Sequence, residues 1–244
     1  AATAGQYDVA IGYQSMADYG GWNVTIGAFT YSLGAGVAIG YNAKAYGASS
    51  VSVGFNSKNA GAYAVSMGWA ANAADAYATA VGAGSFADAW MASAFGVNAW
   101  AGRQSVALGS NAKARGGYTV AIGEMASATG QGAVAIGGSS IDTHAASSAS
   151  GYASVALGAG TASSARFATS VGAHGMAGKD TQSTTNADYT TAFGGEAWAT
   201  EDNATAIGFN SYAQAVDATV LGNSAWTTKA ATNSVAIGTG SLAD

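Results

Sequence analysis

The sequence predicts an all-β solenoid made of 14-residue coils. A phrase ending in glycine, Val120-Ala121-Ile122-Gly123, returns along the whole chain in closely related forms. Its glycines fall at positions 12, 27, 40, 54, 68, 82, 96, 109, 123, 137, 158, 172, 194, 208, 222 and 238. Nine of the fifteen intervals between these positions equal 14, four lie between 13 and 16, and the last two are 21 and 22. A short fixed period indicates stacked coils that contact mainly their neighbours.

Each coil is expected to hold two short strands and two turns. Counted from the anchor glycine as position 0, positions 3 to 5 read Ala-x-Ala, as in Ala43 and Ala45, and positions 11 to 13 read Val-x-Ile. Alternation with period two, bounded by Gly and Asn, is typical of strands. Glycine at this density disfavours helix by about 1 kcal/mol per residue against Ala. Stacking in register places equivalent positions about 4.8 Å apart.

The repeat also predicts which side chains face inward. We expect Val and Ile at positions 11 and 13 to pack against the small residues at positions 3 and 5, because large against small fills a thin layer. Position 12 then faces away, and it holds only Ala, Ser, Thr and one Val. We interpret this column as a close contact between chains. The opposite assignment, with Val and Ile at the contact and Ala inside, stays open. The predicted contact column between chains includes Ala38, Ala80, Ala107, Ala121, Ala135, Ala206 and Ala236.

Composition excludes several classes of protein. Charged residues make up 9% of the chain and the net charge is -5. The five Lys and three Arg form no cluster, so nucleic-acid binding is not expected. The absence of Cys excludes disulfides and thiolate metal sites. No run of about 18 apolar residues occurs, so we expect membrane attachment only through an anchor outside this sequence.

The repeat phrase resembles a known family. The run Asn-Ser-Val-Ala-Ile-Gly at 233–238, with the Ala-x-Ala-x-Gly that follows Gly40 and Gly109, resembles the head repeat of trimeric autotransporter adhesins, the YadA-like heads. The resemblance covers residues 5 to 240. It implies a left-handed parallel β-roll, a homotrimer, and display on the bacterial cell surface at the outer membrane. It also implies a virulence role through adhesion to host matrix, host cells or abiotic surfaces. We therefore expect residues 1–244 to form a single head domain, separated here from any neck, stalk or anchor.

The sequence offers no site for chemistry. Its two histidines, His144 and His174, are separated by roughly two coils, whereas a metal site needs clustered ligands. No residues suggest a nucleophile with its base, and the glycine pairs lack the Lys and helix of a phosphate loop. We expect no catalytic residue, no cofactor and no metal, and hence no enzyme.

The candidate adhesive surface is a set of outward-facing aromatic residues. Position 4 lies between the two inward alanines, so its side chains point out, and position 1 adds further rings. Exposed Trp, Tyr and Phe are frequent anchors of binding surfaces. Stacked ladders that contribute only stability are the alternative. The strongest single patch is formed by Trp198, Tyr212 and Trp226 at 14-residue steps, and the full set adds Trp69, Phe86 and Trp100.

The two long intervals predict insertions near 139–150 and 179–188. Loops that leave a rigid scaffold often carry recognition, and tolerated insertions or loops that clasp a neighbouring subunit are the alternative. The candidate loop contacts are Lys179, Asp180, Gln182 and Asn186.

Two other solenoid classes compete with the adhesin. A hexapeptide-repeat acyltransferase builds each coil from three six-residue steps and places a catalytic His between subunits, and the period of this chain does not match those steps. An ice-binding solenoid needs regular Thr-x-Thr columns, which Thr79, Thr119, Thr190 and Thr205 do not form.

Overall fold

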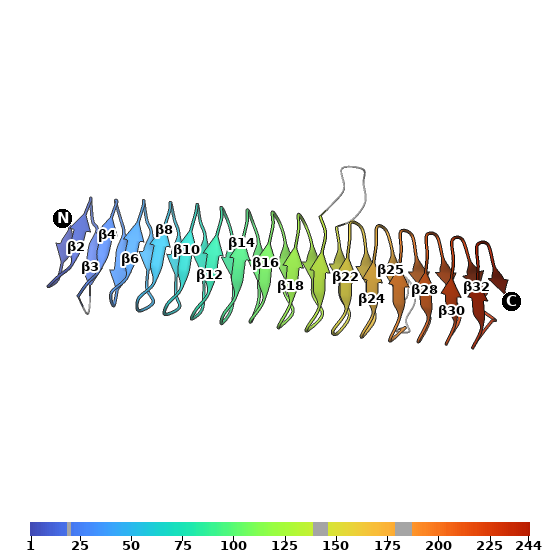
Figure 1. Cartoon of the computed structure of the whole chain (residues 1–244). Helices are drawn as coiled ribbons and strands as arrows, with labels where there is room; N and C mark the ends of the chain where they lie inside the picture. The colour runs from blue at the N-terminus through green and yellow to red at the C-terminus, as the bar shows by residue number, and fades with distance from the viewer. Residues whose placement is uncertain (19–20, 139–145, 179–186) are drawn as a thin grey trace. The chain divides into compact units, whose positions relative to one another are not determined.

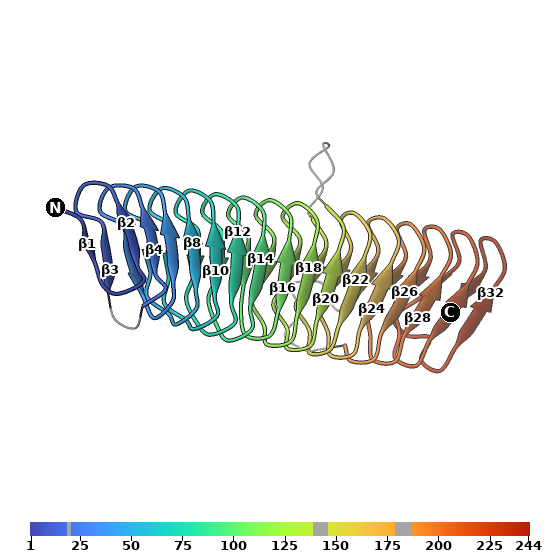
Figure 2. The same cartoon turned by 60° about the vertical axis from the view of Figure 1, so that its left-hand side comes forward.

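The computed structural model describes residues 1–18, 21–138, 146–178 and 187–244 (Figure 1). All regular structure in these residues is β. The chain divides into two compact units, Ala1–Gly117 and Tyr118–Asp244. In each unit every coil gives one strand to each of two parallel sheets, which face each other with turns along both edges (Figure 2). The predicted solenoid of 14-residue coils is confirmed.

The first sheet is formed by the Val-x-Ile strands and is called the Val-x-Ile sheet below. In the first unit it contains β2 (Val9–Ile11), β4 (Val24–Ile26), β6 (Val37–Ile39), β8 (Val51–Val53), β10 (Val65–Met67), β12 (Thr79–Val81), β14 (Ser93–Phe95) and β16 (Val106–Leu108). In the second unit it contains β18 (Val120–Ile122), β20 (Val134–Ile136), β22 (Val155–Leu157), β24 (Thr169–Val171), β26 (Thr191–Phe193), β28 (Thr205–Ile207), β30 (Thr219–Leu221) and β32 (Val235–Ile237).

The second sheet is formed by the shorter strands and is called the Ala-x-Ala sheet. In the first unit it contains β1 (Thr3–Ala4), β3 (Met16–Asp18), β5 (Tyr31–Leu33), β7 (Lys44–Ala45), β9 (Lys58–Asn59), β11 (Asn72–Ala73), β13 (Phe86–Ala87), β15 (Trp100–Ala101) and β17 (Lys113–Ala114). In the second unit it contains β19 (Ser127–Ala128), β21 (Ser148–Ala149), β23 (Ala162–Ser163), β25 (Met176–Ala177), β27 (Trp198–Ala199), β29 (Tyr212–Ala213), β31 (Trp226–Thr227) and β33 (Leu242–Ala243).

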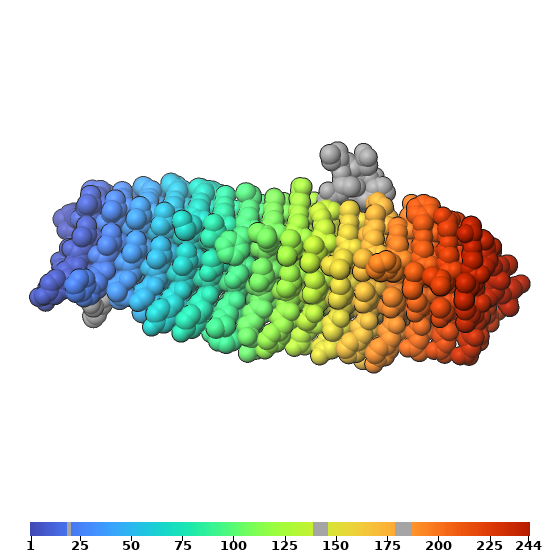
Figure 3. Space-filling model, in the orientation of Figure 1, coloured from blue at the N-terminus to red at the C-terminus, as the bar shows by residue number. Residues whose placement is uncertain are grey.

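Neighbouring coils pair without any shift of the repeat. Val37 lies opposite Val51, and Ile39 lies opposite Val53. The backbone amide of Val37 donates to the carbonyl of Ser50 at 2.9 Å, so the hydrogen bonds of one coil are completed by the next. In the space-filling view, equivalent positions of adjacent coils form rows (Figure 3). Every repeat position therefore becomes a column of side chains.

The interior of each coil holds mostly small side chains. Ala43 and Ala45 of the Ala-x-Ala sheet are fully buried and form one cluster with Ala38 of the Val-x-Ile sheet. The largest fully buried side chain among the described residues is Val220, at position 12. The prediction that positions 3 and 5 face inward is confirmed.

The predicted contact column between chains, which the resemblance assigns to a trimer, is wrong. Its alanines are buried inside the coil of their own chain, so they are not available to another chain. The reason is the thinness of the coil, because two sheets this close favour Ala, Ser or Thr at position 12, where Val220 is the largest side chain. Ala lies inside, as in the opposite assignment, and the Val-x-Ile side chains at positions 11 and 13 point outward. Ala38, Ala80, Ala107, Ala121, Ala135 and Ala206 are 0% exposed and Ala236 is 3% exposed.

The anchor glycines hold one coil against the next. Gly54 has a φ of +133°, and a Cβ added to it would lie 2.3 Å from the carbonyl oxygen of Gly68. That oxygen occupies the space of the missing side chain, so both the backbone conformation and the close approach require glycine. The Ser57 hydroxyl donates to the Gly54 carbonyl at 3.1 Å and satisfies it inside the turn.

Substitution of Gly54 by Ala is expected to lower the free energy of unfolding by about 3–5 kcal/mol, because it adds both strain and overlap. Gly117→Ala is the matched control: no atom lies within 4 Å of its added Cβ, and its φ is not in the left-handed region. The control is expected to raise stability by about 0.4–1 kcal/mol. Chemical denaturation followed by circular dichroism measures both. Equal effects would contradict the role given to the anchor glycine.

Candidate functional site

The outer face of the Val-x-Ile sheet is apolar along each unit. Positions 11 and 13 hold only Val, Ile, Leu, Met, Phe, Thr and Ser in every copy. Many of these side chains are well exposed in the single chain, and a surface of this kind is unusual for a monomer. Examples are Ile11, Leu108, Phe193, Leu221 and Ile237, between 45% and 66% exposed.

Position 4 on the Ala-x-Ala sheet points outward, as the sequence predicts. Phe86 on β13 and Trp100 on β15 meet edge to face, with 5.5 Å between ring centroids and 61° between planes. The guanidinium carbon of Arg115 lies 4.0 Å from the centroid of the Trp100 ring, a cation–π contact within the chain. Trp69 is separate from this pair, because it follows an anchor glycine in a turn, where it is 61% exposed.

The strongest predicted patch is brought together on three adjacent strands of the second unit. Trp198 on β27 and Tyr212 on β29 have ring centroids 5.8 Å apart and planes tilted by 36°. Tyr212 pairs in register with Trp226 on β31. Trp226 is 44% exposed, while Trp198 and Tyr212 are half-buried. The three side chains therefore form one row on the outer face of the sheet.

A hollow lies at one end of this row. It has a volume of about 460 Å³ and is lined by Trp198, Tyr212 and Met176 together with the polar side chains of His174 and Glu196. The hollow exists because the side chain at position 4 becomes smaller in the two coils before Trp198, where it is Met176 and then Ala162. Gly160 and Gly175 also leave the adjoining turn without side chains. Rings and a carboxylate thus share one open concavity.

Rings also form ladders along the turns. Phe29 at position 2 joins the position-1 rings Tyr13 and Tyr41, with centroids 5.5 Å apart on each side, and Tyr41 stacks on Phe55 at 5.2 Å. A second ladder, at position 9, was not predicted from the sequence. It lies two residues before each Val-x-Ile strand, and this constant spacing was the available signal. Its stacked pairs are Tyr7–Trp22, Tyr63–Tyr77 and Phe167–Tyr189.

The position-9 rings lie on left-handed backbone. Tyr63 and Tyr77 have φ of 57° and 59°, a region that favours Gly and Asn. Asn203 and Asn233 hold the same position elsewhere with φ of 57° and 56°. Stacking therefore offsets backbone strain at the aromatic positions.

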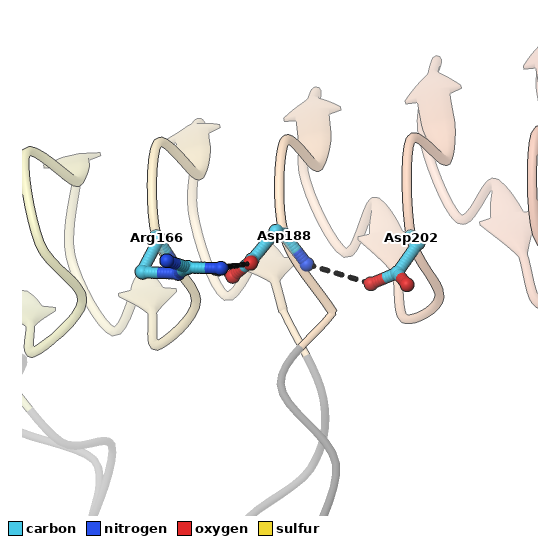
Figure 4. Close-up of polar contacts among 3 residues, drawn as sticks. All are labelled: Arg166, Asp188 and Asp202. Carbon is cyan, nitrogen blue, oxygen red and sulfur yellow. Dashed lines mark hydrogen bonds and ion pairs between the residues drawn. The ribbon is translucent and has the colours of Figure 1, made fainter.

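An ion pair joins two coils of the second unit. The Arg166 guanidinium donates to the Asp188 carboxylate, with Nε at 2.9 Å from Oδ2, and the backbone amide of Asp188 donates to Oδ1 of Asp202 at 2.8 Å (Figure 4). The Arg166 side chain is 60% exposed, whereas that of Asp188 is 14% exposed. The hydrogen bond and charge of Arg166 hold the pKa of Asp188 below its usual range.

Several predicted residues lie outside the described part of the chain. These are the candidate loop contacts Lys179, Asp180, Gln182 and Asn186, and also His144. Within residues 1–18, 21–138, 146–178 and 187–244, no group of three His, Cys, Asp or Glu side chains is placed to hold a metal ion. The same described residues contain no helix of the length and apolarity needed to cross a bilayer.

Comparison with protein families decides the identity of the repeat. The profile described as the YadA head domain repeat matches residues 35–57, 60–85, 91–112, 101–123, 114–140, 181–211 and 213–241, together well over half of the chain. The chain belongs to the YadA head domain family. No curated protein matches the chain. YadA-like heads are non-enzymatic, adhesin-type domains that bind host or surface targets and form trimers.

Asp188 makes the folding stability of this YadA-type head depend on pH. Because its folded-state pKa is lowered, its stabilising contribution is present above the unfolded value of about 3.9 and is lost as the pH falls further. Arg166→Gln is expected to lower the thermal midpoint at pH 7, with the difference vanishing near pH 2. Lys229→Gln removes the same charge elsewhere in the unit and serves as control. A difference between Arg166→Gln and the native chain that is constant from pH 7 to pH 2 would contradict this account.

Proposed function

We propose that this chain is the head of a bacterial surface adhesin. It is a left-handed β-roll homotrimer that attaches to host extracellular matrix, host cells or abiotic surfaces, without enzymatic activity, and is held at the outer membrane through an anchor outside this sequence. Membership in the YadA head family supports the proposal. The repeat continues through both units, which supports treating residues 1–244 as one head domain.

The trimer contact is proposed on the Val-x-Ile sheet. The supporting observation is the run of exposed, uncharged side chains at positions 11 and 13, opposite the inward alanines. Covering such a face with two further copies removes apolar area from water at about 25 cal/mol per Å². The Ala-x-Ala sheet is the contrasting face, because Lys44, Lys58 and Lys113 lie in its outward column.

The adhesive surface is proposed on the outward face of the Ala-x-Ala sheet. The row Trp198, Tyr212 and Trp226 carries the proposal, because three rings on adjacent strands are presented together. Phe86, Trp100 and Trp69 are secondary contacts. Lys179, Asp180, Gln182 and Asn186 are further proposed contacts on sequence grounds alone, because they interrupt the repeat.

The trimer proposal is tested by introducing charged residues on the apolar face of the Val-x-Ile sheet. Ile122→Glu with Ile136→Glu places carboxylates on neighbouring strands and is expected to give folded chains that sediment at the monomer mass of 23.7 kDa. Ser127→Glu with Ser148→Glu, on paired strands of the other sheet, is the matched control and is expected to stay trimeric. Sedimentation equilibrium measures both. A native chain that is a stable folded monomer would remove the proposal.

The adhesive row is tested by substitution of Trp198, Tyr212 and Trp226 together with Ser. We expect attachment to at least one surface of a panel of collagen, fibronectin, laminin, plastic and glass to fall about tenfold or more, since each aromatic anchor contributes about 1 kcal/mol or more. Circular dichroism checks that the β structure survives. Substitution of Tyr13, Tyr41 and Phe55 with Ser removes three exposed rings from the turns, outside the proposed adhesive set, and serves as control. Loss of attachment only in the control would move the adhesive surface to the turns.

A further inference from the structure

The two tryptophans on equivalent strands have different surroundings. Trp100 and Trp198 both occupy position 4. In the coil after Trp100, position 6 is Arg115, whose guanidinium covers the ring at 4.0 Å. In the coil after Trp198, position 6 is Gln214. Trp198 instead lines the hollow of about 460 Å³.

The hollow also has a carboxylate in its lining. Glu196, at position 2 of the same coil as Trp198, lines it together with His174. No Lys or Arg is among the described residues that line the hollow. A cationic group near this surface is therefore attracted.

We propose that this hollow binds the guanidinium group of an arginine from a basic, extended polypeptide segment of the adhesion target. The guanidinium stacks on the Trp198 ring, as Arg115 does on Trp100, and Glu196 accepts its hydrogen bonds. Tyr212 and Met176 contact the methylene stem. This inference rests on the proposed adhesive function and names the chemistry that its aromatic row recognises.

Charge favours an arginine over a sugar. Both stack on tryptophan and both can donate hydrogen bonds to Glu196, but only the guanidinium also gains attraction from the charge of that carboxylate. A second hollow of comparable size, about 500 Å³ in the first unit, is lined by Phe29 and Tyr31 but also by Lys44. A lysine there disfavours a cationic ligand, so the inference concerns the second unit alone.

The test uses the whole chain and a fluorescein-labelled hexapeptide, Gly-Arg-Gly-Arg-Gly-Arg. Fluorescence anisotropy is expected to show binding that weakens as salt is added. A peptide with Lys in place of Arg is expected to bind more weakly. A peptide with the uncharged isostere citrulline is expected not to bind.

Two variants and two matched controls locate the contact. Trp198→Ser and Glu196→Gln are each expected to weaken Arg-peptide binding about tenfold. Tyr118→Ser removes an exposed ring elsewhere in the unit, outside the hollow and the aromatic row, and Glu124→Gln removes an exposed carboxylate elsewhere in the unit. Both controls are expected to change binding less than twofold.

The inference is overturned if the Arg peptide does not bind, if the citrulline peptide binds equally, or if the two variants match their controls. Binding of maltohexaose that is lost in Trp198→Ser but unchanged in Glu196→Gln also overturns it and assigns the hollow to saccharides. Failure of the adhesion proposal is distinct, because that proposal fails only when the triple serine variant still attaches to every surface that the native chain binds.

Discussion

The close approach of one anchor glycine to the next is the constraint on which this structure depends. The carbonyl oxygen of Gly68 occupies the space where a side chain on Gly54 would be, and Gly40 and Gly54 repeat the arrangement one coil earlier, with 2.5 Å to the added Cβ. The turn can therefore be this tight only with glycine. Tight turns bring the two sheets close together and fix the spacing of every column.

A thin coil decides what each face can do. With mostly Ala, Ser and Thr inside, the larger apolar side chains at positions 11 and 13 of the Val-x-Ile sheet lie outside, where they remain partly exposed to water. Burying small side chains contributes little, since the hydrophobic contribution scales with area. Stability then depends on coil-to-coil hydrogen bonds and on covering the apolar face. The geometry that makes the coil regular also leaves a face suited to association.

The sequence predicted the coil, the two strands and the inward alanines at positions 3 and 5, because period and alternation are local signals. It assigned the Val-x-Ile strand to the wrong orientation. Alternation shows that Val37 and Ala38 face opposite ways but not which one is inside, and the usual preference for large apolar residues in a core favoured the wrong choice. The distance between the sheets decides the matter, and no local pattern encodes it. The hollow beside Trp198 also escaped prediction, since it depends on Gly160, Ala162 and Gly175 in other coils.

A regular repeat can still present a specific surface, because the side chains at one repeat position differ from coil to coil. Backbone geometry at position 4 is nearly the same on β15 and β27, so the difference between the sites arises from a few side chains on adjacent coils. Arg115 occupies the ring face of Trp100 from within the chain, whereas Gln214 stands at the corresponding place near Trp198. In such a protein, a binding site is formed by side chains from neighbouring coils and not by one coil alone. One outward substitution in the next coil can therefore cover or uncover a binding ring while the stacked glycines, and with them the fold, stay unchanged.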